Sequence, residues 1–117
     1  MKEKIYDLKW CGKIYKIFLE KTKYVNNGTL AINMISIDKD GNENYFNTLT
    51  VNLVDSCIMA DANYFQYVDT NNLSEKIVDW LVKNKIAEAS CFYGFSGFCK
   101  YPLMIFTDEA LEGMRRA

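Results

Sequence analysis

The sequence contains no histidine, and this absence excludes several kinds of chemistry. Histidine is the commonest general base near neutral pH and the commonest metal ligand, so a Ser–His or Cys–His nucleophilic pair cannot form. Proline is nearly absent as well, since Pro102 is the only one. No proline-rich or low-complexity linker divides the chain, and we expect residues 1–117 to form a single domain.

The chain also lacks an excess of charge of either sign, because 14 Lys and Arg face 15 Asp and Glu. A net charge of −1 argues against direct nucleic-acid binding, which needs a basic surplus, and against mimicry of DNA, which needs a dense carboxylate surface. The charge is uneven, however: residues 1–24 are basic overall and residues 25–75 are acidic. This indicates either ordinary solvated strand faces or a bipolar surface that steers a charged partner.

Long apolar runs are missing too, and none approaches the roughly 18 residues that span a bilayer. No signal peptide is apparent, so we predict a cytoplasmic protein with reduced thiols and no membrane association. The four cysteines do not form the closely spaced pairs that structural zinc requires, and we predict no metal and no cofactor. We expect small, buried, apolar cysteines; they are Cys11, Cys57, Cys91 and Cys99.

Two segments match only part of a catalytic or metal-binding motif. Residues 94–98 read Gly-Phe-Ser-Gly-Phe, whereas a nucleophile elbow requires glycine where Phe98 stands. Residues 38–43 start like a calcium loop but end in Glu43 where that loop needs glycine, so a plain hairpin turn is the better explanation. The sequence therefore predicts a protein that is not an enzyme, with no catalytic residues.

The first half of the chain shows the alternation of apolar and polar residues that is typical of strands. Half of all residues are hydrophobic, which is enough to close a core. Turn-forming residues stand at 11–12, 26–28 and 38–42. Strands joined by such short turns form an antiparallel meander; the predicted strands are residues 6–10, 15–20, 30–37 and 45–53.

The second half changes to a helical period. Apolar residues predict a helix over residues 73–85 that is capped by Asn72 and packs its Trp80 side across the sheet. We further expect an extended segment, a glycine-aromatic loop, a last strand and a short C-terminal helix; they cover residues 64–68, 91–99, 101–107 and 108–115. The predicted fold class is α+β, with an antiparallel meander sheet of about four to five strands packed by one main helix.

Aromatic residues are concentrated in the loop from Cys91 to Cys99. These rings either fold back over the edge of the sheet or form an exposed patch of the kind that anchors protein interfaces. Stacking on single-stranded bases is the weaker alternative, because Lys100 is the only cation beside them. The aromatics and the turn carboxylates are the candidate partner-binding residues: Phe92, Tyr93, Phe95, Phe98, Asp38, Asp40 and Glu43.

Four segments together resemble a family of small bacterial proteins classed as a domain of unknown function. They read YVNNGTLAI (24–32), LTVNL (49–53), VDTNN (68–72) and SGFCKYPL (96–103). The family is associated with plasmids and conjugative elements of Gram-positive bacteria, and no catalytic residues are assigned in it. The resemblance implies carriage on a mobile genetic element and a counter-defence role, as an anti-CRISPR inhibitor that binds the type II CRISPR effector nuclease with its guide RNA.

Other functions stay open at this point. One is a nucleic-acid-associated accessory factor of plasmid transfer or maintenance that uses the lysine-rich first hairpin. Another is an interaction module within the transfer machinery of the element itself. An exposed strand edge also leaves a homodimer open. The lysines of the first hairpin are Lys9, Lys13, Lys16, Lys21 and Lys23.

Overall fold

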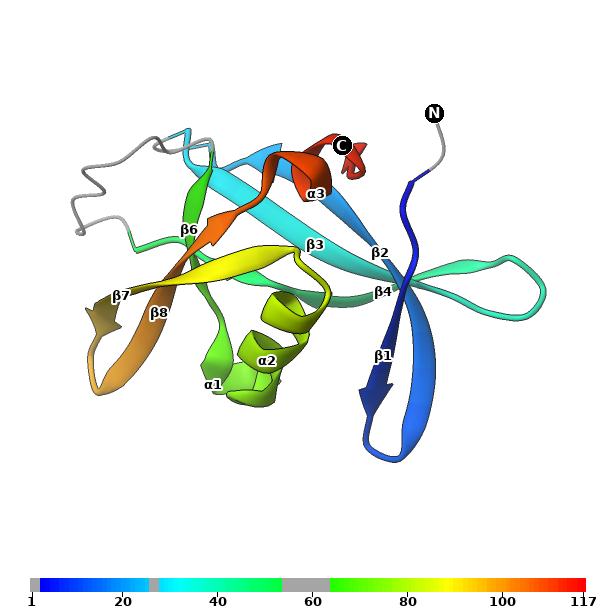
Figure 1. Ribbon diagram of the computed structural model, residues 1–117, viewed down its shortest axis with the longest axis horizontal. Coiled ribbons are helices and arrows are strands. Elements are labelled where there is room, and N and C mark those ends of the chain that lie inside the picture. The colour runs from blue at the N-terminus through cyan, green and yellow to red at the C-terminus, as the bar shows by residue number, and fades with distance from the viewer. Residues whose placement is uncertain (1–2, 26–27, 54–63) are drawn as a thin grey trace.

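The first half of the chain forms the predicted antiparallel meander. The computed structural model describes residues 3–25, 28–53 and 64–117, which are shown in Figure 1. Neighbouring strands of the first sheet follow one another along the chain and pair antiparallel. The prediction of a meander is therefore confirmed; its strands are β1 (Tyr6–Trp10), β2 (Lys13–Lys23), β3 (Leu30–Ile37) and β4 (Glu43–Thr48).

The turn between β1 and β2 has both central residues at positive φ, with Cys11 at 50° and Gly12 at 80°. This is the pattern of a type I′ turn, whose twist matches that of the paired strands. Cys11 is exposed there, Cys91 is exposed at a φ of 69°, and Cys99 is half-buried. The expectation of buried cysteines is wrong for these three, because they lie in turns and in a hairpin. Cys57 lies outside the described residues.

The fourth strand is shorter than predicted. The alternation predicts one strand over residues 45–53, but β4 ends at Thr48, and β5 (Thr50–Val51) belongs to a second sheet. Leu49, between the two, hydrogen-bonds through its backbone both to β3 and to the residue that follows β6. A strand that passes from one sheet to another keeps its alternation, so the sequence pattern could not reveal the crossing.

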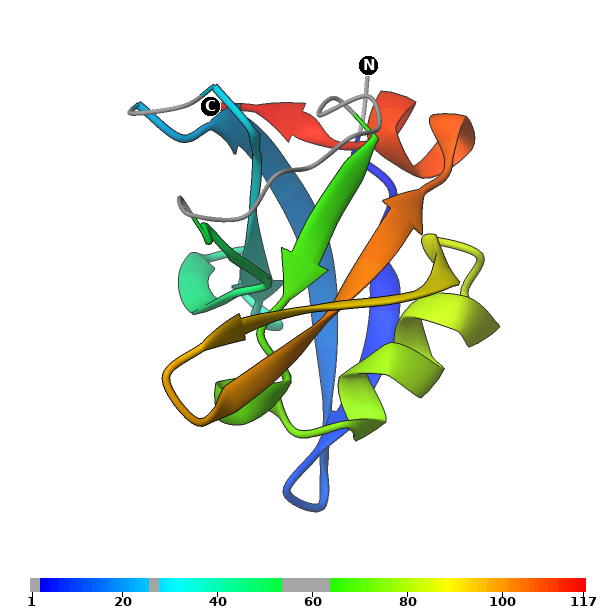
Figure 2. The same cartoon turned by 90° about the vertical axis from the view of Figure 1, so that its left-hand side faces the viewer.

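The second sheet has the order β5-β6-β8-β7 and is antiparallel throughout. The predicted extended segment before the helix is β6 (Phe65–Val68), and the predicted last strand is β8 (Cys99–Phe106). The predicted glycine-aromatic loop is wrong, because these residues belong to the long strand β7 (Ala87–Ser96) and to its hairpin with β8. Figure 2 shows this hairpin extending away from the body of the molecule.

Two short helices replace the single predicted helix. They are α1 (Thr70–Leu73) and α2 (Lys76–Lys83). Asp69 caps α1, since its carboxylate accepts a hydrogen bond from the backbone N–H of Asn72 at 3.1 Å. Asn72 is therefore not the cap, because Asp69 supplies an equally good cap three residues earlier. Ser74, at a φ of 63°, separates the two helices.

The C-terminal segment also differs from the prediction. Helix α3 (Asp108–Glu112) is shorter than the predicted residues 108–115 and is capped by Thr107. The chain then returns to the first sheet as β9 (Arg115–Arg116), which pairs parallel with β2. The backbone N–H of Ala117 donates to the carbonyl of Lys21 at 3.0 Å and extends this pairing.

The main core lies between the two sheets and α2. Trp80 packs edge-to-face on Tyr6, with 5.9 Å between ring centroids, and its indole N–H donates to the carbonyl of Asp7 at 2.7 Å. The predicted packing of the Trp80 side of the helix against the sheet is thus confirmed. A smaller cluster on the other face of the second sheet contains Tyr67, Tyr101 and Leu103.

Strands dominate this architecture, so the fold is mainly β and corrects the predicted α+β class with one main helix. Two sheets of four to five strands carry the structure, and the helices are short. Within the described ranges, no helix is long and apolar enough to cross a membrane.

Candidate protein-binding site

The aromatic residues of the β7–β8 hairpin are exposed rather than folded back over the sheet. The exposed fractions are 70% for Phe92, 50% for Tyr93 and 65% for Phe95, and Phe98 is fully exposed. Figures 1 and 2 both show the end of this hairpin projecting from the body. The structure therefore brings together the four aromatic residues singled out in the sequence, on one end of one hairpin.

Two glycines fix the shape of this hairpin. Gly97 and Phe98 form the two-residue turn between Ser96 and Cys99, and the positive φ of Gly97 (60°) at its first position is typical of a type II′ turn. Gly94 lies against the smaller core: a Cβ there would come within 2.5 Å of Leu53 Cδ1 and 2.6 Å of Tyr67 Cε1. Gly94 thus anchors the hairpin end to the sheet through close backbone approach.

A β-bulge decides which way the rings face. The register shifts between Ala89 and Phe92. The hydroxyl of Ser90 donates to the carbonyl of Leu103 and accepts from the N–H of Phe92, which holds the bulge in place. Phe92 consequently faces the same side as Leu103, while Tyr93 and Phe95 face the opposite side of the hairpin.

The hairpin end is apolar with a single cation beside it. No charged residue occurs from Ala89 to Cys99. Lys100 places its ammonium 4.0 Å from the ring centroid of Tyr93, a cation–π contact that holds this ring in position. Such a surface suits an apolar protein partner better than a phosphate backbone, because it offers rings and little charge.

The acidic turn between β3 and β4 has a different character. The carboxylate of Asp38 accepts backbone hydrogen bonds from Asp40 at 2.9 Å and from Asn42 at 2.8 Å. The bond from Asn42 contributes most to holding the pKa of Asp38 below its usual range. Asp38 thus closes the turn, and Asp40 is exposed at its tip.

The carboxylate of Glu43 also has a partner within the molecule, which is Arg115. Arg115 donates two hydrogen bonds to this carboxylate, at 2.7 and 2.8 Å, and a third to Glu3, while its guanidinium lies 4.4 Å from the ring centroid of Phe18. These bonds lower the pKa of both carboxyl groups and raise that of Arg115. The sequence analysis missed this role of Arg115 because its partners are far away in the sequence.

The carboxylates and the aromatics do not form one site. Figure 1 shows the β3–β4 turn and the β7–β8 turn at opposite ends of the long axis, along which the molecule extends 42 Å. A single small partner cannot readily cover both. Since Asp38 and Glu43 already have partners in the chain, the aromatic end is the stronger candidate.

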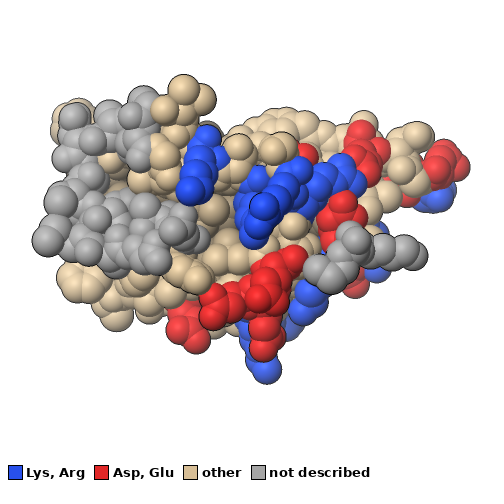
Figure 3. Space-filling model, turned by 90° about the horizontal axis from the view of Figure 1, so that it is seen from above, with Lys and Arg blue, Asp and Glu red and all other residues tan. Residues whose placement is uncertain are grey.

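The lysines of the first hairpin are also divided. Lys9 and Lys13 flank the β1–β2 turn, and Lys16 forms an ion pair with Asp7. The remaining two line a pocket of about 470 Å³ at the other end of β2. Figure 3 shows that the face carrying α3 and the C-terminal strand bears Asp and Glu beside Lys and Arg, so it is not uniformly basic.

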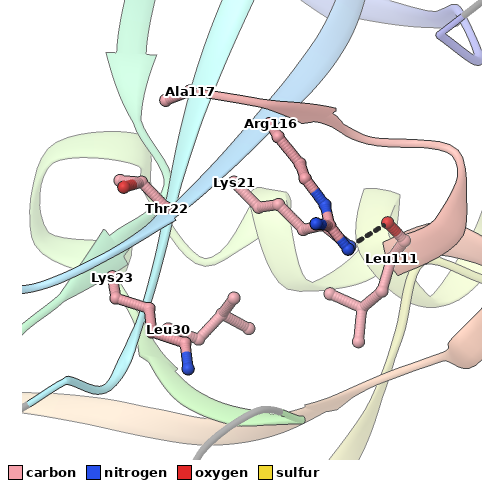
Figure 4. A pocket seen from close by; sticks show the side chains of 7 residues that line it. All are labelled: Lys21, Thr22, Lys23, Leu30, Leu111, Arg116 and Ala117. Atoms are coloured by element: carbon pink, nitrogen blue, oxygen red, sulfur yellow. Dashed lines mark hydrogen bonds between the residues drawn. The ribbon is translucent and has the colours of Figure 1, made fainter.

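The pocket at the end of β2 is shown in Figure 4. Its apolar floor consists of Leu30 and Leu111, which are buried. Lys21 and Arg116 extend toward the carbonyl of Leu111, to which the Lys21 ammonium donates at 2.8 Å, while Lys23 points elsewhere. Lys21 therefore satisfies a carbonyl at the end of α3 rather than presenting a free charge.

The described ranges contain no group of three His, Cys, Asp or Glu residues that could hold a metal ion. A groove of about 980 Å³ between the β1–β2 hairpin and α2 is lined by Trp10, Ile14 and Trp80 with lysines around them. Asp7 and Asp79 line it too, and the indole N–H of Trp80 already has a partner in β1, so this groove is of mixed polarity.

Three of the segments that carry the family resemblance contribute hydrogen bonds where the chain passes from the first sheet to the second. The hydroxyls of Tyr24 and Thr50 lie 3.0 Å apart, and Thr50 also accepts from the N–H of Ile32 at 3.1 Å. The N–H of Asp69 donates to the carbonyl of Leu49 at 2.9 Å. The fourth segment, residues 96–103, forms the turn of the aromatic hairpin and part of β8. Residues 26–27 lie outside the described ranges.

Comparisons with known proteins place the chain in a family without assigning it an activity. No curated protein and no solved structure matches it. A family model with the description "Domain of unknown function (DUF4313)" matches residues 18–116, which include both sheets from within β2 onward. The chain belongs to this family, the DUF4313 domain of unknown function.

Proposed function

We propose that this protein is a non-catalytic binding module that contacts a protein partner through the end of the β7–β8 hairpin. The observation that carries the proposal is the exposure of Phe92, Tyr93, Phe95 and Phe98 on one uncharged hairpin end. Large rings presented together mark protein interfaces, where aromatic residues supply much of the binding energy.

The hairpin is suited to binding because its shape is fixed before a partner arrives. The type II′ turn at Gly97, the bulge at Cys91 and the close packing of Gly94 hold the backbone. A preorganised surface loses little conformational entropy on association. Full burial of one phenylalanine side chain is worth about 1.5–3 kcal/mol, so two or three anchoring rings would give useful affinity.

For the partner, we propose the type II CRISPR effector nuclease with its guide RNA, which makes the protein an inhibitor from a mobile genetic element. This step rests on the resemblance to a plasmid-associated family and on the modest net charge, which favours contact with protein over mimicry of DNA. We place the contact at the aromatic hairpin, because two of the three turn carboxylates, those of Asp38 and Glu43, already accept hydrogen bonds within the molecule.

Binding to purified effector–guide RNA complex tests both steps. We expect the double variant Phe92→Ser/Phe98→Ser to weaken binding at least tenfold, a loss of about 1.4 kcal/mol. Tyr45→Ser is the matched control, since Tyr45 is an exposed ring on the opposite hairpin. In cells, the wild-type chain should reduce interference against a targeted plasmid, and the double variant should not.

Each step can fail separately. If the wild-type chain neither binds the effector nor changes plasmid interference, the counter-defence role is wrong. To test protein binding without that assumption, a photoreactive residue in place of Phe98 or of Tyr45 can be compared in host lysate. Crosslinks that form equally from both positions would argue against the aromatic hairpin as the binding surface.

A second candidate function, an accessory factor that binds nucleic acid, is favoured by the pocket at the end of β2, which Lys23 and Arg116 also line. Titration with DNA and RNA at low salt tests it, because phosphate contacts weaken steeply as salt rises. The variant Lys23→Gln/Arg116→Gln should then lose binding. The absence of binding by the wild-type chain at low salt would remove this alternative.

A further inference from the structure

The free edge of β7 offers backbone hydrogen bonds in addition to the rings. β7 is the last strand in the order β5-β6-β8-β7, so in the described part of the chain only one of its two sides is paired. In an antiparallel pair, opposite residues alternate between those that bond to each other and those whose N–H and C=O point away. The residues of β7 that point away are available to another strand.

Pro102 identifies these residues. It lies opposite Tyr93 and has no N–H to donate, and the pairing of β8 with β6 on its other side ends at Leu103. A proline within a sheet occupies a position that needs no ladder bond. The Tyr93–Pro102 pair is therefore a non-bonded pair, and the alternation makes the pair of Phe95 with Lys100 non-bonded as well.

The bulge agrees with this assignment. The N–H of Phe92 donates to the Ser90 hydroxyl, which is bound to a carbonyl of β8, so the N–H of Phe92 faces β8. The N–H and C=O of Tyr93, the next residue, then face the open edge, as do those of Phe95. No other described residue hydrogen-bonds to the backbone of Tyr93 or Phe95 outside the β7–β8 ladder.

Beyond the bulge at Ser90 and Cys91, this edge carries no charged residue that would discourage pairing. Natural edge strands carry charged residues, lysine above all, that discourage association. The edge strand β1 follows this rule with Asp7 and Lys9. From Ala89 to Cys99, by contrast, β7 and its turn have no charge at all, and nothing repels a second uncharged strand.

We propose that a second copy of this chain occupies the edge, with the two β7 strands antiparallel about a two-fold axis at Gly94. In this register, Tyr93 of each copy lies opposite Phe95 of the other, and the two outward-pointing residues exchange backbone hydrogen bonds. The strand is self-complementary: each tyrosine ring meets a phenylalanine ring across the strands, and the two glycines meet at the axis. No charge opposes a like charge.

Edge pairing leaves the faces of the hairpins open, because side chains stand roughly perpendicular to the plane of the paired strands. Two hairpins side by side therefore double both faces: one carries Tyr93 and Phe95 of each copy, and the other carries Phe92 of each copy. In this respect the inference rests on the proposed function, since the doubled faces would contact the same partner. The paired segment is short and smaller than a standard interface of about 1,600 Å², so we expect dissociation in roughly the micromolar range.

Sedimentation equilibrium of the purified chain, from about 1 to 500 micromolar, tests the dimer over this range. The variant Tyr93→Lys/Phe95→Lys places like charges opposite each other and should be monomeric throughout. The variant Tyr93→Lys/Phe95→Glu places each lysine opposite a glutamate of the second copy and should associate again. Ile14→Lys, at an exposed position of the first hairpin, is the control that should associate like wild type.

Restored association in the charge-pair variant would support the register, and circular dichroism would show that all the variants are folded. A monomeric wild-type chain, or a dilysine variant that associates as before, would overturn the proposal. If the wild-type chain is monomeric and Phe92→Ser/Phe98→Ser still loses its partner, the dimer is wrong and the proposed function stands. If the wild-type chain and the charge-pair variant both dimerise but Phe92→Ser/Phe98→Ser binds the partner as tightly as wild type, the proposed function is wrong and the dimer stands.

Discussion

Two hairpin turns lie at opposite ends of the molecule, one between β3 and β4 and the other between β7 and β8. They differ in whether their side chains contact the rest of the protein. At the first, Asp38 and Glu43 are charged but bind groups within the chain. At the second, rings that would ordinarily be buried are exposed. The difference shows that charge at the first turn serves the structure, whereas the rings at the second turn are exposed and contribute little to the core, which is why we propose them as a binding surface.

The largest expected effect on stability comes from Gly94→Val, which tests whether the end of the β7–β8 hairpin is packed against the smaller core. The added side chain would meet Leu53 and Tyr67 at less than a normal contact distance. Overpacking of this kind costs about 1–3 kcal/mol, and chemical denaturation should show a loss of unfolding free energy in that range. A stability equal to wild type would mean that the hairpin end is not packed against the smaller core.

The next effect concerns the ion pairs beside the acidic turn. Because Arg115 lowers the pKa of Glu3 and Glu43 in the folded state, their stabilisation is complete above the ordinary glutamate pKa of 4.5 and is lost as pH falls through the lowered values. The Tm of Glu43→Gln should therefore fall less than that of wild type between pH 5 and pH 3. The exposed Glu88→Gln is the control, and an identical pH profile for wild type and Glu43→Gln would contradict the assignment.

A smaller effect separates the two aspartates of the acidic turn. Asp38→Ala removes the acceptor for two backbone N–H groups, whereas Asp40→Ala removes an exposed side chain at the tip. We expect a lower Tm for the first variant and an unchanged Tm for the second, measured by thermal unfolding at pH 7. Equal effects would mean that the Asp38 carboxylate does not hold the turn.

The smallest effect is expected at the aromatic turn itself. Phe98 is fully exposed, so Phe98→Ser should change the unfolding free energy by no more than about 0.5 kcal/mol. Chemical denaturation at low protein concentration, where the chain is monomeric, measures this directly. A larger loss would indicate that the ring packs on the body of the molecule.

Local patterns predicted much of the fold. The meander, β6, β8 and the packing of Trp80 follow from alternation, turn residues and helical period, which are properties of neighbouring residues. The passage from β4 to β5 was not predictable, because alternation continues through Leu49 while the hydrogen-bonding partner changes. The helix cap was misplaced because Asp69 and Asn72 are both good caps three residues apart.

The candidate site was predictable in composition and not in geometry. The cluster of rings and its freedom from charge are visible in the sequence, but the bulge that sets which face of the sheet each ring takes depends on the register between two strands. A glycine-aromatic segment reads as a loop, yet Gly94 lies within a strand because its missing side chain makes room for Tyr67. Arg115 could not be identified because its contacts join the two ends of the chain to β4.

The most direct test of the central claim is the unfolding free energy of one variant in which all four rings of the aromatic hairpin are replaced: Phe92→Ser/Tyr93→Ser/Phe95→Ser/Phe98→Ser. If the rings serve binding and not folding, the variant should lose less than about 2 kcal/mol, as expected for four surface changes. A loss of about 3–5 kcal/mol or more for these rings, typical of a buried aromatic residue such as Phe106, would contradict the account.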